Sequence, residues 1–439
     1  MKRLLFIGTG YVGLVLGACF ADKGYEVTCS DIDEKKIGIL KSGQCTIFEP
    51  GLDRLIKKNL NKRLHFTTNI DLSVQKADVV FITVGTPIRS NGDIDIGYVE
   101  SAAYKIANNL NGYKIIVLKS TVPVGTAKHI YRIIQSKSRV TEFDLVSNPE
   151  FLREGSAVHD CLYMDRLVIG ASNKIASRRL EQLYQSFYFK EVIHTNFETA
   201  EMIKYASNTF LATKISFING IARICDQVGA DVEMVAKGMG LDDRIGKKFL
   251  KAGIGFGGSC LPKDTKALIR IAETNGYDFS LLKAVIKTNL EQYKYIIEKL
   301  LLATREIEVK TIGILGLTFK PNTNDLRNAP SIPIIKKLLK LGFVIKAYDP
   351  VSIKEVKRKF SHESNISFFC DIYKTIDKCD VCMILTEWDE IRRIDLKRML
   401  QLLNYPIIVD GRNIFDINKM ESFGFSYYPI GRGQPTLGM

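Results

Sequence analysis

Residues 8–13, G-T-G-Y-V-G, constrain the fold more strongly than any other stretch of this 439-residue chain. The apolar residues 4–7 before the glycines predict a buried strand, and the residues after the glycines predict a helix to about Asp22. A second predicted strand, residues 26–29, leads to Asp31, at the spacing expected for an acid that binds a cofactor ribose. The sequence therefore predicts a parallel α/β sheet that binds a dinucleotide, with the pyrophosphate at the helix N-terminus.

Each glycine of this motif has its own physical reason. Gly8 allows the tight turn, Gly10 lets the backbone approach the pyrophosphate, and Gly13 lets the helix pack closely on the strand. Asp31 would repel a 2′-phosphate and so favours NAD, although Lys36 nearby leaves NADP open. The same N-terminal stretch, basic residues before an apolar run, is also similar to a secretory signal, but the dinucleotide interpretation explains more of its residues.

Composition limits the class of protein and its partners. A hydrophobic fraction of 46% and a charged fraction of 25% are typical of a globular protein, here long enough for two or three domains. The net charge of +14 comes from scattered Lys and Arg residues, which favours a small anionic ligand over nucleic acid. We expect no membrane partner, because no segment has about 18 uninterrupted apolar residues.

Nine cysteines at irregular spacing form no disulfide framework and indicate a reducing compartment, so we predict a cytoplasmic location. Cys379 and Cys382 match C-x-x-C, but they lie in an apolar run that predicts a strand, where neighbouring side chains face opposite ways. We predict no metal site.

Further α/β units follow the first. Residues 77–84 and 114–118 predict strands, and Thr86 and Thr121 follow them at the sheet edge where ligands bind. Both threonines are candidates for contact with the cofactor or water, and each could equally be a helix N-cap or turn residue.

The segment N-P-E-F-L-R-E-G carries two carboxylates. If the turn is helical, Glu150 and Glu154 lie on one face and repel each other, which a ligand must justify. The alternative is two solvated surface acids.

Residues 196–302 change to long helical patterns. Glu201, Lys204 and Asn208 share one helix face because they are spaced by three and four residues. Lys204 stands among apolar and small residues, where desolvation lowers a lysine pKa and prepares a base, whereas most helix lysines reach water. We interpret this helical region as a spine between domains and as a dimer surface.

The α/β pattern returns at Thr311, with strands predicted at 344–348, 366–369, 381–385 and 406–409. This part lacks a complete G-x-G-x-x-G, so we predict a second nucleotide-like ligand without a second NAD. Lys320, Arg327 and Arg412 lie near strand ends, where a phosphate would bind. The predicted fold is two Rossmann-like doubly wound domains, 1–195 and 306–439, joined by a long central helical region, 196–305.

Residues 255–264, G-F-G-G-S-C-L-P-K-D, form the candidate reactive loop. Pro262 is typical of a first helical turn, so Cys260 is predicted to lie at a helix N-terminus. The helix end and Lys263 favour a thiolate, which makes Cys260 a candidate nucleophile. The alternative is a small buried apolar residue. Flanking glycines that let a ligand approach, and Asp264 one turn along, favour function.

Taken in order, these motifs resemble the UDP-glucose/GDP-mannose dehydrogenase family of NAD-dependent nucleotide-sugar dehydrogenases over almost the whole chain. The resemblance is carried by G-T-G-Y-V-G at Gly8, K-S-T-V-P-V-G-T ending at Thr126, N-P-E-F-L-R-E-G from Asn148, K-x-x-x-N from Lys204, R-I-G-K-K-F-L from Arg244, the decapeptide from Gly255, G-L-T-F-K from Gly316 and D-G-R-N from Asp410.

The resemblance implies two successive oxidations of the sugar's 6-hydroxyl, to a carboxylate, without release of the aldehyde. It assigns Cys260 as the nucleophile, Lys204 and Asn208 as groups that assist proton removal and stabilise oxyanions, and Glu150, Thr121 and Asp264 as groups that activate water. The implied cofactor contacts are Gly8, Gly10, Tyr11, Val12, Gly13, Asp31, Lys36, Thr86, Thr121, Glu154, Lys263 and Arg327. The implied substrate contacts are Glu150, Phe151, Leu152, Lys204, Asn208, Arg244, Phe249, Lys251, Gly253, Gly255, Gly257, Phe319, Lys320 and Arg412.

The resemblance also implies a homodimer or higher homo-oligomer in which Arg244 reaches the substrate of the partner subunit. Leu261 departs from the family pattern, since many UDP-glucose enzymes carry an aromatic residue after the cysteine and GDP-mannose enzymes often carry leucine. UDP-glucose is the favoured substrate because the D-G-R-N and R-I-G-K-K-F-L motifs are similar to those of the UDP-glucose branch. The alternatives are GDP-mannose, a UDP-N-acetylhexosamine, or a non-catalytic NAD-binding scaffold.

Overall fold

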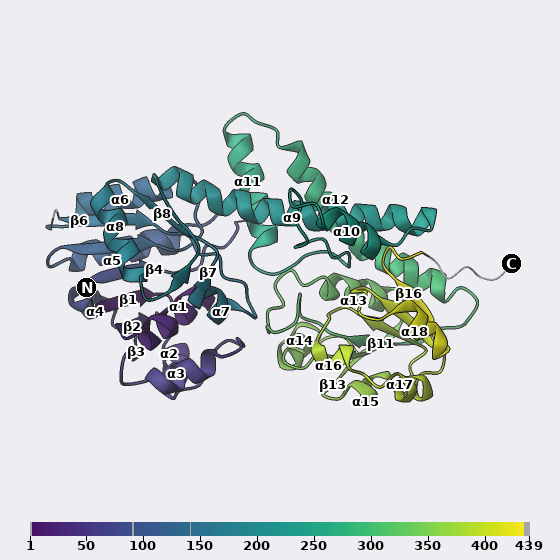
Figure 1. Ribbon diagram of the computed structural model, residues 1–439. Coiled ribbons are helices and arrows are strands. Elements are labelled where there is room, and N and C mark those ends of the chain that lie inside the picture. Colours follow the sequence, from purple (N-terminus) through teal and green to yellow (C-terminus); the bar gives the residue numbers. More distant parts are fainter. Residues whose placement is uncertain (1, 90–91, 141, 434–439) are drawn as a thin grey trace. The chain divides into compact units, whose positions relative to one another are not determined.

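The computed structural model describes residues 2–89, 92–140 and 142–433. The chain forms two compact units, one made of Met1–Ser207 with Lys266–Gly276, the other of Asn208–Thr265 with Tyr277–Met439. Each unit is built around one large sheet (Figure 1). The predicted domain limits at 195 and 305 stay a prediction.

The sheet of the first unit has eight strands in the order β10-β8-β6-β5-β4-β1-β2-β3. Its first six strands therefore lie in the order 3-2-1-4-5-6, and neighbours among them are parallel, which is the dinucleotide-binding arrangement. The antiparallel pairing of β6 with β8 adds a further edge. The strands are β1 (Arg3–Ile7), β2 (Glu26–Ser30), β3 (Leu64–Thr67), β4 (Val79–Ile82), β5 (Lys114–Leu118), β6 (Phe143–Ser147), β8 (Leu167–Ala171) and β10 (Val192–Thr195), with β7 (Tyr163–Met164) and β9 (Tyr188–Phe189) paired apart from them.

Helices cover both faces of this sheet because strand side chains alternate and both sets are apolar. Leu4 and Phe6 pack in one core with α1, α2, α3, α7 and α8, whereas Leu5 and Ile7 pack in the other with α4, α5 and α6. The helices are α1 (Tyr11–Asp22), α2 (Glu34–Lys41), α3 (Leu52–Asn59), α4 (Ile70–Lys76), α5 (Gly97–Asn109), α6 (Thr126–Lys137), α7 (Ala157–Leu162) and α8 (Lys174–Tyr184). The predicted doubly wound architecture is confirmed.

The central region is helical, as predicted. Helix α9 (Phe197–Val228) begins in the first unit and continues in the second, and it is followed by α10 (Val232–Gly240), α11 (Leu261–Thr274) and α12 (Ser280–Ala303) (Figure 1). The segment between α10 and α11 has no regular structure and contains the first six residues of the decapeptide, 255–260, whereas residues 261–264 form the first turn of α11.

The sheet of the second unit repeats the order of the first. Its six strands are all parallel and lie as β13-β12-β11-β14-β15-β16, again 3-2-1-4-5-6. They are β11 (Thr311–Leu315), β12 (Val344–Tyr348), β13 (Ile366–Phe369), β14 (Val381–Ile384), β15 (Ile407–Asp410) and β16 (Ser426–Pro429), and the helices between them are α13 (Ser331–Lys340), α14 (Ile353–Lys359), α15 (Ile372–Ile376), α16 (Asp389–Arg392), α17 (Leu396–Leu402) and α18 (Ile417–Ser422). The sequence predicted β12 to β15 and the return of the α/β pattern at Thr311, where β11 begins, but it did not predict β16.

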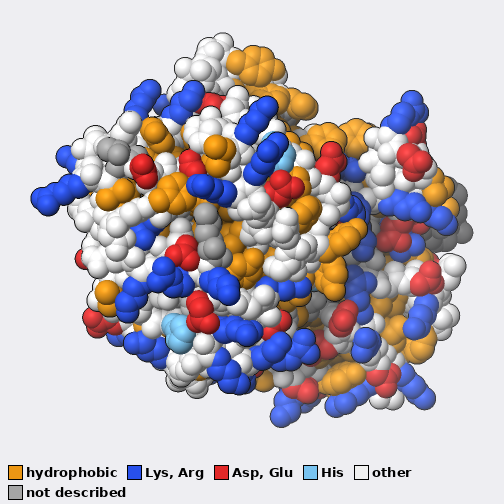
Figure 2. Space-filling model, turned by 60° about the vertical axis from the view of Figure 1, so that its left-hand side comes forward, with side chains coloured by type: hydrophobic (Ala, Val, Ile, Leu, Met, Phe, Trp, Pro, Cys, Tyr) orange, Lys and Arg blue, Asp and Glu red, His pale blue; other side chains and the backbone are white. Residues whose placement is uncertain are grey.

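Charged side chains are spread widely over the surface. Figure 2 shows Lys and Arg side chains over the visible face, with acidic and apolar side chains between them. Among the described residues, none of the helices is both long and apolar enough to cross a membrane.

Candidate active site

The glycine turn after β1 is shaped for a dinucleotide. Helix α1 begins directly after Gly10, and no side chain of the described residues caps it, so its first N–H groups are available to an anion. A Cβ at Gly10 would meet nothing within 4 Å, which leaves the approach to the helix end open. A Cβ at Gly13 would lie 2.0 Å from the Gly8 carbonyl oxygen, so the close packing predicted for this glycine is present. These residues fit the pyrophosphate of NAD.

Asp31 follows β2 and fixes the same turn. Its Oδ2 accepts hydrogen bonds from the N–H and Oγ1 of Thr9 at 2.9 and 2.8 Å and from Lys36 Nζ at 3.0 Å. Burial opposes ionisation of Asp31, but these donors lower its pKa, so the residue is a carboxylate at neutral pH. A carboxylate at this strand end fits the ribose hydroxyls of NAD and repels a 2′-phosphate.

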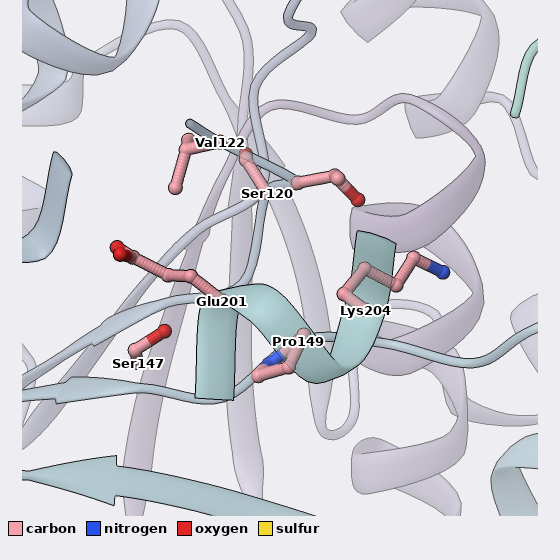
Figure 3. A pocket seen from close by; sticks show the side chains of 7 residues that line it. Ser120, Val122, Ser147, Pro149, Glu201 and Lys204 are labelled. Carbon is pink, nitrogen blue, oxygen red and sulfur yellow. The ribbon is translucent and has the colours of Figure 1, made fainter. Parts of the chain in front are cut away.

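The strand ends beside the turn carry the two predicted threonines. Thr86 Oγ1 donates to the Thr121 carbonyl at 2.8 Å, which joins the segments after β4 and β5. Thr121 also lines a small pocket with Ser120, Val122, Ser147, Pro149, Glu201 and Lys204 (Figure 3). The structure thus brings Thr86, Thr121 and Lys204 to one edge of the first sheet.

Glu201 and Lys204 extend to different sides of the first turns of α9 (Figure 3). Glu201 accepts the N–H groups of Gly125 and Ala127 at 2.6 and 2.8 Å and so stabilises the N-terminus of α6. Burial raises the pKa of Glu201 to about 7, although these two N–H groups favour the charged form. Lys204 is buried, as predicted for a desolvated base, and does not reach water as most helix lysines do.

Lys204 binds the N-P-E segment after β6. Its Nζ lies 2.6 Å from the Glu150 carbonyl oxygen and 3.2 Å from Glu150 Oε1. Glu150 Oε2 accepts the Leu152 N–H at 2.5 Å, and Lys204 Nζ lies 5.2 Å from the Phe151 ring centroid. Glu150 is therefore a buried acid paired with a buried base and not a solvated surface acid.

The segment around Glu150 is not helical, so the proposed i,i+4 repulsion between Glu150 and Glu154 does not arise. Residues 148–153 have no regular structure, and Lys204 Nζ bonds the Glu150 carbonyl oxygen. Helix α7 begins only at Ala157, and Glu154 lies in the turn before it.

Cys260 lies at the start of α11, as predicted from Pro262. The Cys260 carbonyl accepts the Asp264 N–H at 2.8 Å, the first bond of the helix, and its Sγ is 3.5 Å from Ser259 Oγ. Asp264 is buried and accepts a bond from Asn208 Nδ2 at 2.6 Å and one from Lys263 Nζ at 2.6 Å. The second unit thus assembles a half-buried thiol, a buried acid and an ammonium at the first turn of α11, with the amide of Asn208 from α9 bonded to the acid.

The loop before Cys260 is held by buried amides. The Gly253 N–H donates to Asn219 Oδ1 at 2.8 Å, and Asn289 bonds both the N–H and the carbonyl of Phe256, at 2.7 and 3.0 Å. A Cβ at Gly257 would lie 2.3 Å from the Asn328 carbonyl oxygen, so the glycine leaves room for the backbone of residue 328. The sequence had suggested that the glycines of this loop leave room for a ligand. The same loop contains Phe249, whose φ of 64° is left-handed. The surrounding fold therefore holds the Phe249 backbone in a conformation that residues other than glycine rarely adopt.

The edge of the second sheet gathers three of the predicted substrate residues. Arg412 donates from its guanidinium to the carbonyls of Leu385 and Phe319 at 2.9 and 3.1 Å, and Lys320 Nζ lies 5.4 Å from the Phe319 ring centroid. Asp349 accepts the N–H groups of Leu317 and Thr318 at 2.8 and 3.1 Å, which repeats the pairing of Asp31 with Thr9. Helix α13 starts only at Ser331, so this edge lacks the close helix end of the first sheet.

Other predicted residues make different contacts, and among them Arg327 accepts the Gly258 N–H of the reactive loop on its carbonyl oxygen at 2.8 Å. Arg244 is 89% exposed and pairs with Asp242, and Arg327 is 62% exposed and pairs with Asp325. Tyr11 accepts the Gly155 N–H on its hydroxyl at 2.8 Å. Val12 packs against the core, and Lys251 is exposed.

Sequence reasoning missed three buried polar residues near these clusters. Lys119 and Asn148 bond each other beside the segment of Glu150, and Asp349 fixes the second nucleotide-type turn. Lys119 and Asn148 stood inside motifs already singled out, and an uninterrupted apolar strand before Lys119 was the available signal of its burial.

Fold and sites together define a nucleotide-binding α/β oxidoreductase. Its first sheet carries a complete dinucleotide-binding turn, and its second sheet carries a similar turn without a helix that begins directly after it. Three models of the UDP-glucose/GDP-mannose dehydrogenase family match the chain: the NAD binding domain over residues 2–188, the central domain over 198–291 and the UDP binding domain over 313–417. The chain belongs to this family and is an NAD-dependent dehydrogenase.

Individual relatives cover nearly the full length. The chain is 53% identical over 435 residues to the UDP-glucose 6-dehydrogenase TuaD of Bacillus subtilis, which spans 98% of this chain and 94% of the relative. A UDP-glucose dehydrogenase structure from Pyrobaculum islandicum has a TM-score of 0.89 at 33% identity, covering 98% of this chain and 97% of that one. A UDP-D-ManNAc dehydrogenase structure from Pyrococcus horikoshii has a TM-score of 0.85 at 28% identity, covering 98% and 99%.

Proposed function

We propose that this protein oxidises C6 of UDP-glucose twice with NAD, to UDP-glucuronate, and that Cys260 holds the intermediate covalently. The arrangement of Cys260 at the start of α11, with buried Asp264 one turn along, is the observation that carries the proposal. The helix end favours the thiolate that such a step requires. The substrate is favoured by the 53% identity to a UDP-glucose 6-dehydrogenase.

Bound NAD supplies the hydride acceptor for both oxidations. Lys204, supported by Glu150, removes the hydroxyl proton as the C6 hydride leaves. The Cys260 thiolate then adds to the aldehyde carbon, and a proton moves to the new hydroxyl to give a thiohemiacetal. Loss of a second hydride and of that proton gives a thioester.

Hydrolysis of the thioester ends the reaction. Water adds to the thioester carbon, the carbon–sulfur bond breaks, and the carboxylate and the Cys260 thiolate are released with two protons to bases. Asp264 and Glu150 are the carboxylates assigned to water activation, with Thr121 positioning the water. Asn208 donates a hydrogen bond to Asp264 and so fixes its orientation. The covalent bond explains why the aldehyde is retained between oxidations.

The second sheet binds the nucleotide in this proposal. Lys320 and Arg412 bring positive charge to one strand edge beside Phe319, which suits a diphosphate next to a ring. Phe249 and the loop at 251–257 complete the sugar site, and a rigid loop reduces the entropy cost of binding.

A sister substrate is the second candidate within the family. Leu261 follows the cysteine where many UDP-glucose enzymes carry an aromatic residue, and one similar structure is a UDP-D-ManNAc dehydrogenase. The non-catalytic scaffold is disfavoured because Cys260, Asp264, Asn208 and Lys204 are all present.

The proposal includes a homodimer or larger homo-oligomer in the cytoplasm. Phe210, Phe217 and Ile224, spaced by seven residues on α9, are 64%, 52% and 54% exposed and form an apolar row that suits a second copy. Arg244 has a side chain that is 89% exposed, so it can reach a partner when its surface ion pair with Asp242 opens.

A substrate panel tests the activity. Purified protein is incubated with NAD and, separately, UDP-glucose, GDP-mannose and UDP-N-acetylmannosamine, and NADH absorbance is compared with sugar consumed. We expect turnover of UDP-glucose with about two NADH per sugar. One NADH per sugar would contradict the double oxidation. Cys260→Ala should lower kcat by about 10³-fold or more while NAD binding persists, since the nucleophile alone is removed.

A further inference from the structure

Lys119 is a fully buried cation that none of the steps above uses. It follows the last residue of β5 and is 3% exposed, and no ion pair within 4.0 Å joins it to a carboxylate of the described residues. Its Nζ donates to Asn148 Oδ1 at 2.8 Å and to the Tyr184 hydroxyl at 3.3 Å, and lies 5.4 Å from the Tyr184 ring centroid. A cation without a counter-charge is costly to bury, so its retention calls for a reason.

The contacts of Lys119 lead directly to the Lys204–Glu150 pair. Asn148 Oδ1 also accepts the Tyr184 hydroxyl at 2.9 Å, and Asn148 Nδ2 donates to the Val168 carbonyl at 2.7 Å, so the whole amide is fixed. Glu150 lies two residues further and is held by Lys204 Nζ through its carbonyl and Oε1. Lys119 therefore anchors the segment that presents Glu150 to Lys204.

Four titratable side chains surround Lys119, and they lie on the segment after β6, on α7, on α8 and on α9. Burial lowers the pKa of Lys119 to about 8, Glu150 and Cys161 act to raise it, and Lys204 acts to lower it. Tyr184 on α8 remains a neutral phenol, because burial raises its pKa. Electrostatic coupling is reciprocal, so the charge of Lys119 opposes a second charge on Lys204 as strongly as Lys204 opposes that of Lys119.

We propose that Lys119 is a positioning residue that holds Asn148–Glu150 in place and, by its positive charge, favours the neutral amine of Lys204. The inference rests on the proposed function, because Lys204 must act there as the base. A neighbouring cation makes proton loss from an amine easier, which keeps more of the base active near neutral pH.

Replacing Lys119 tests the charge. In Lys119→Met the acid limb of the kcat–pH profile should move up by about one pH unit, because Lys204 then loses its proton less readily, so kcat at pH values below that limb should fall by about tenfold. KM for NAD should change less than twofold, since the glycine turn is untouched. Lys119→Arg should keep the limb near its wild-type position, because the charge stays.

Lys114 supplies a matched control at the other end of the same strand. It is also buried without a carboxylate partner among the described residues, its Nζ bonds the carbonyls of Ala77 and Gln75 at 2.7 and 3.2 Å, and burial lowers its pKa. Lys114→Met should alter thermal stability similarly but leave the acid limb in place. An equal shift in both variants, or no shift in a folded Lys119→Met protein, would overturn the inference.

A variant that fails to fold and a wild-type protein without activity each lead to a definite conclusion. If Lys119→Met fails to fold by circular dichroism, Lys119→Gln, whose amide can still donate to Asn148, takes its place, and failure of both while Lys114→Met folds shows a purely structural role. A wild-type protein that oxidises none of the nucleotide sugars refutes the proposed function itself, which separates that failure from a failure of the Lys119 inference.

Discussion

Single residues at this site act through the backbone that they fix as well as through their own chemistry. Asp31 shows this, because one carboxylate oxygen orders the glycine turn through Thr9, and the same carboxylate stands at the end of β2, where the proposed function places the cofactor ribose. Asp349 orders the corresponding turn of the second sheet but is 1% exposed, so its carboxylate is not available to a ligand. An aspartate at this strand end therefore has one carboxylate that a ribose can reach in the first sheet and one that only supports the backbone turn in the second.

The charge of Asp31 should decide between the two nicotinamide cofactors. In Asp31→Asn the amide oxygen can still accept from Thr9, but the charge-assisted bonds to the ribose weaken. A hydrogen bond to a charged group is worth about 1.5–3 kcal/mol, so KM for NAD should rise about tenfold or more, while KM for NADP should fall or stay unchanged. Steady-state kinetics with both cofactors measure this.

Asp349→Asn is the control for that experiment, since it makes the same change in the second sheet. It should leave KM for NAD within about twofold of wild type, because the buried Asp349 bonds only the backbone and the Thr318 hydroxyl of the second sheet's own turn. Equal increases of KM for NAD and NADP in Asp31→Asn would refute the ribose assignment.

At the scale of elements, β1 and α1 approach each other as closely as the backbone allows. The hydrogen-bonded Thr83 side chain and the Gly8 carbonyl occupy the space where a Gly13 side chain would lie, at 2.5 and 2.0 Å from its Cβ position. The shape of the turn and the position of the helix end therefore depend on the absence of a side chain at Gly13.

Gly13→Ala should lower the free energy of unfolding by about 3 kcal/mol, because the new Cβ meets backbone that cannot move aside without displacing β1 or β4. Urea unfolding of the apoprotein, followed by circular dichroism, measures this. Gly38→Ala in α2 is the matched control, since its Cβ would meet nothing within 4 Å, and it should be neutral or stabilise by up to about 1 kcal/mol. A Gly13→Ala protein as stable as wild type would contradict the packing argument.

Elements with strong local signals were predictable, and long-range polar contacts were not. The runs at Lys114–Leu118 and Val344–Tyr348 became strands with the predicted limits because buried parallel strands read as continuous apolar stretches. The strand Ser426–Pro429 was missed, since its alternating burial gives a weak pattern. The bonds of Lys119 to Asn148 and of Glu201 to Gly125 join residues 29 and 76 positions apart, which local periodicity cannot indicate.

For the site, the motifs predicted which residues carry the chemistry, but they predicted only part of the geometry. Pro262 located Cys260 at a helix start, and that placement is confirmed. The assigned roles of Cys260, Lys204 and Asp264 stay predictions, because they depend on a bound sugar. The reason given for Gly257 was incomplete, since Asn328 approaches it from more than 70 positions away in the chain.

At the scale of the whole molecule, the same strand order serves two ligands by a change at one turn. In the first sheet a helix starts three residues after Gly8, whereas in the second α13 starts 15 residues after Gly316, so only the first offers a helix end to a pyrophosphate. The intervening residues carry Phe319 and Lys320 instead. In the proposed function, these side chains bind phosphate in the second sheet, whereas backbone N–H groups bind it in the first.

The apolar row of α9 should hold two copies of the chain together. Phe217→Glu places a charge in the middle of Phe210, Phe217 and Ile224 and should shift the protein to monomers, as measured by size-exclusion chromatography with light scattering. Phe423→Glu, at an aromatic residue that is also exposed but lies after α18, should leave the oligomer intact. A wild-type protein that is monomeric at micromolar concentration would contradict the dimer proposal directly.

Mixed dimers then test whether Arg244 serves the partner's site. Arg244→Ala and Cys260→Ala proteins should each be nearly inactive, since one lacks a contact to the substrate and the other lacks the nucleophile. After mixing and subunit exchange, a dimer with one chain of each kind has one site with Cys260 from one chain and Arg244 from the other. Random pairing should therefore restore about a quarter of wild-type activity. No restoration, with exchange verified by mass spectrometry, would show that Arg244 acts only within its own chain.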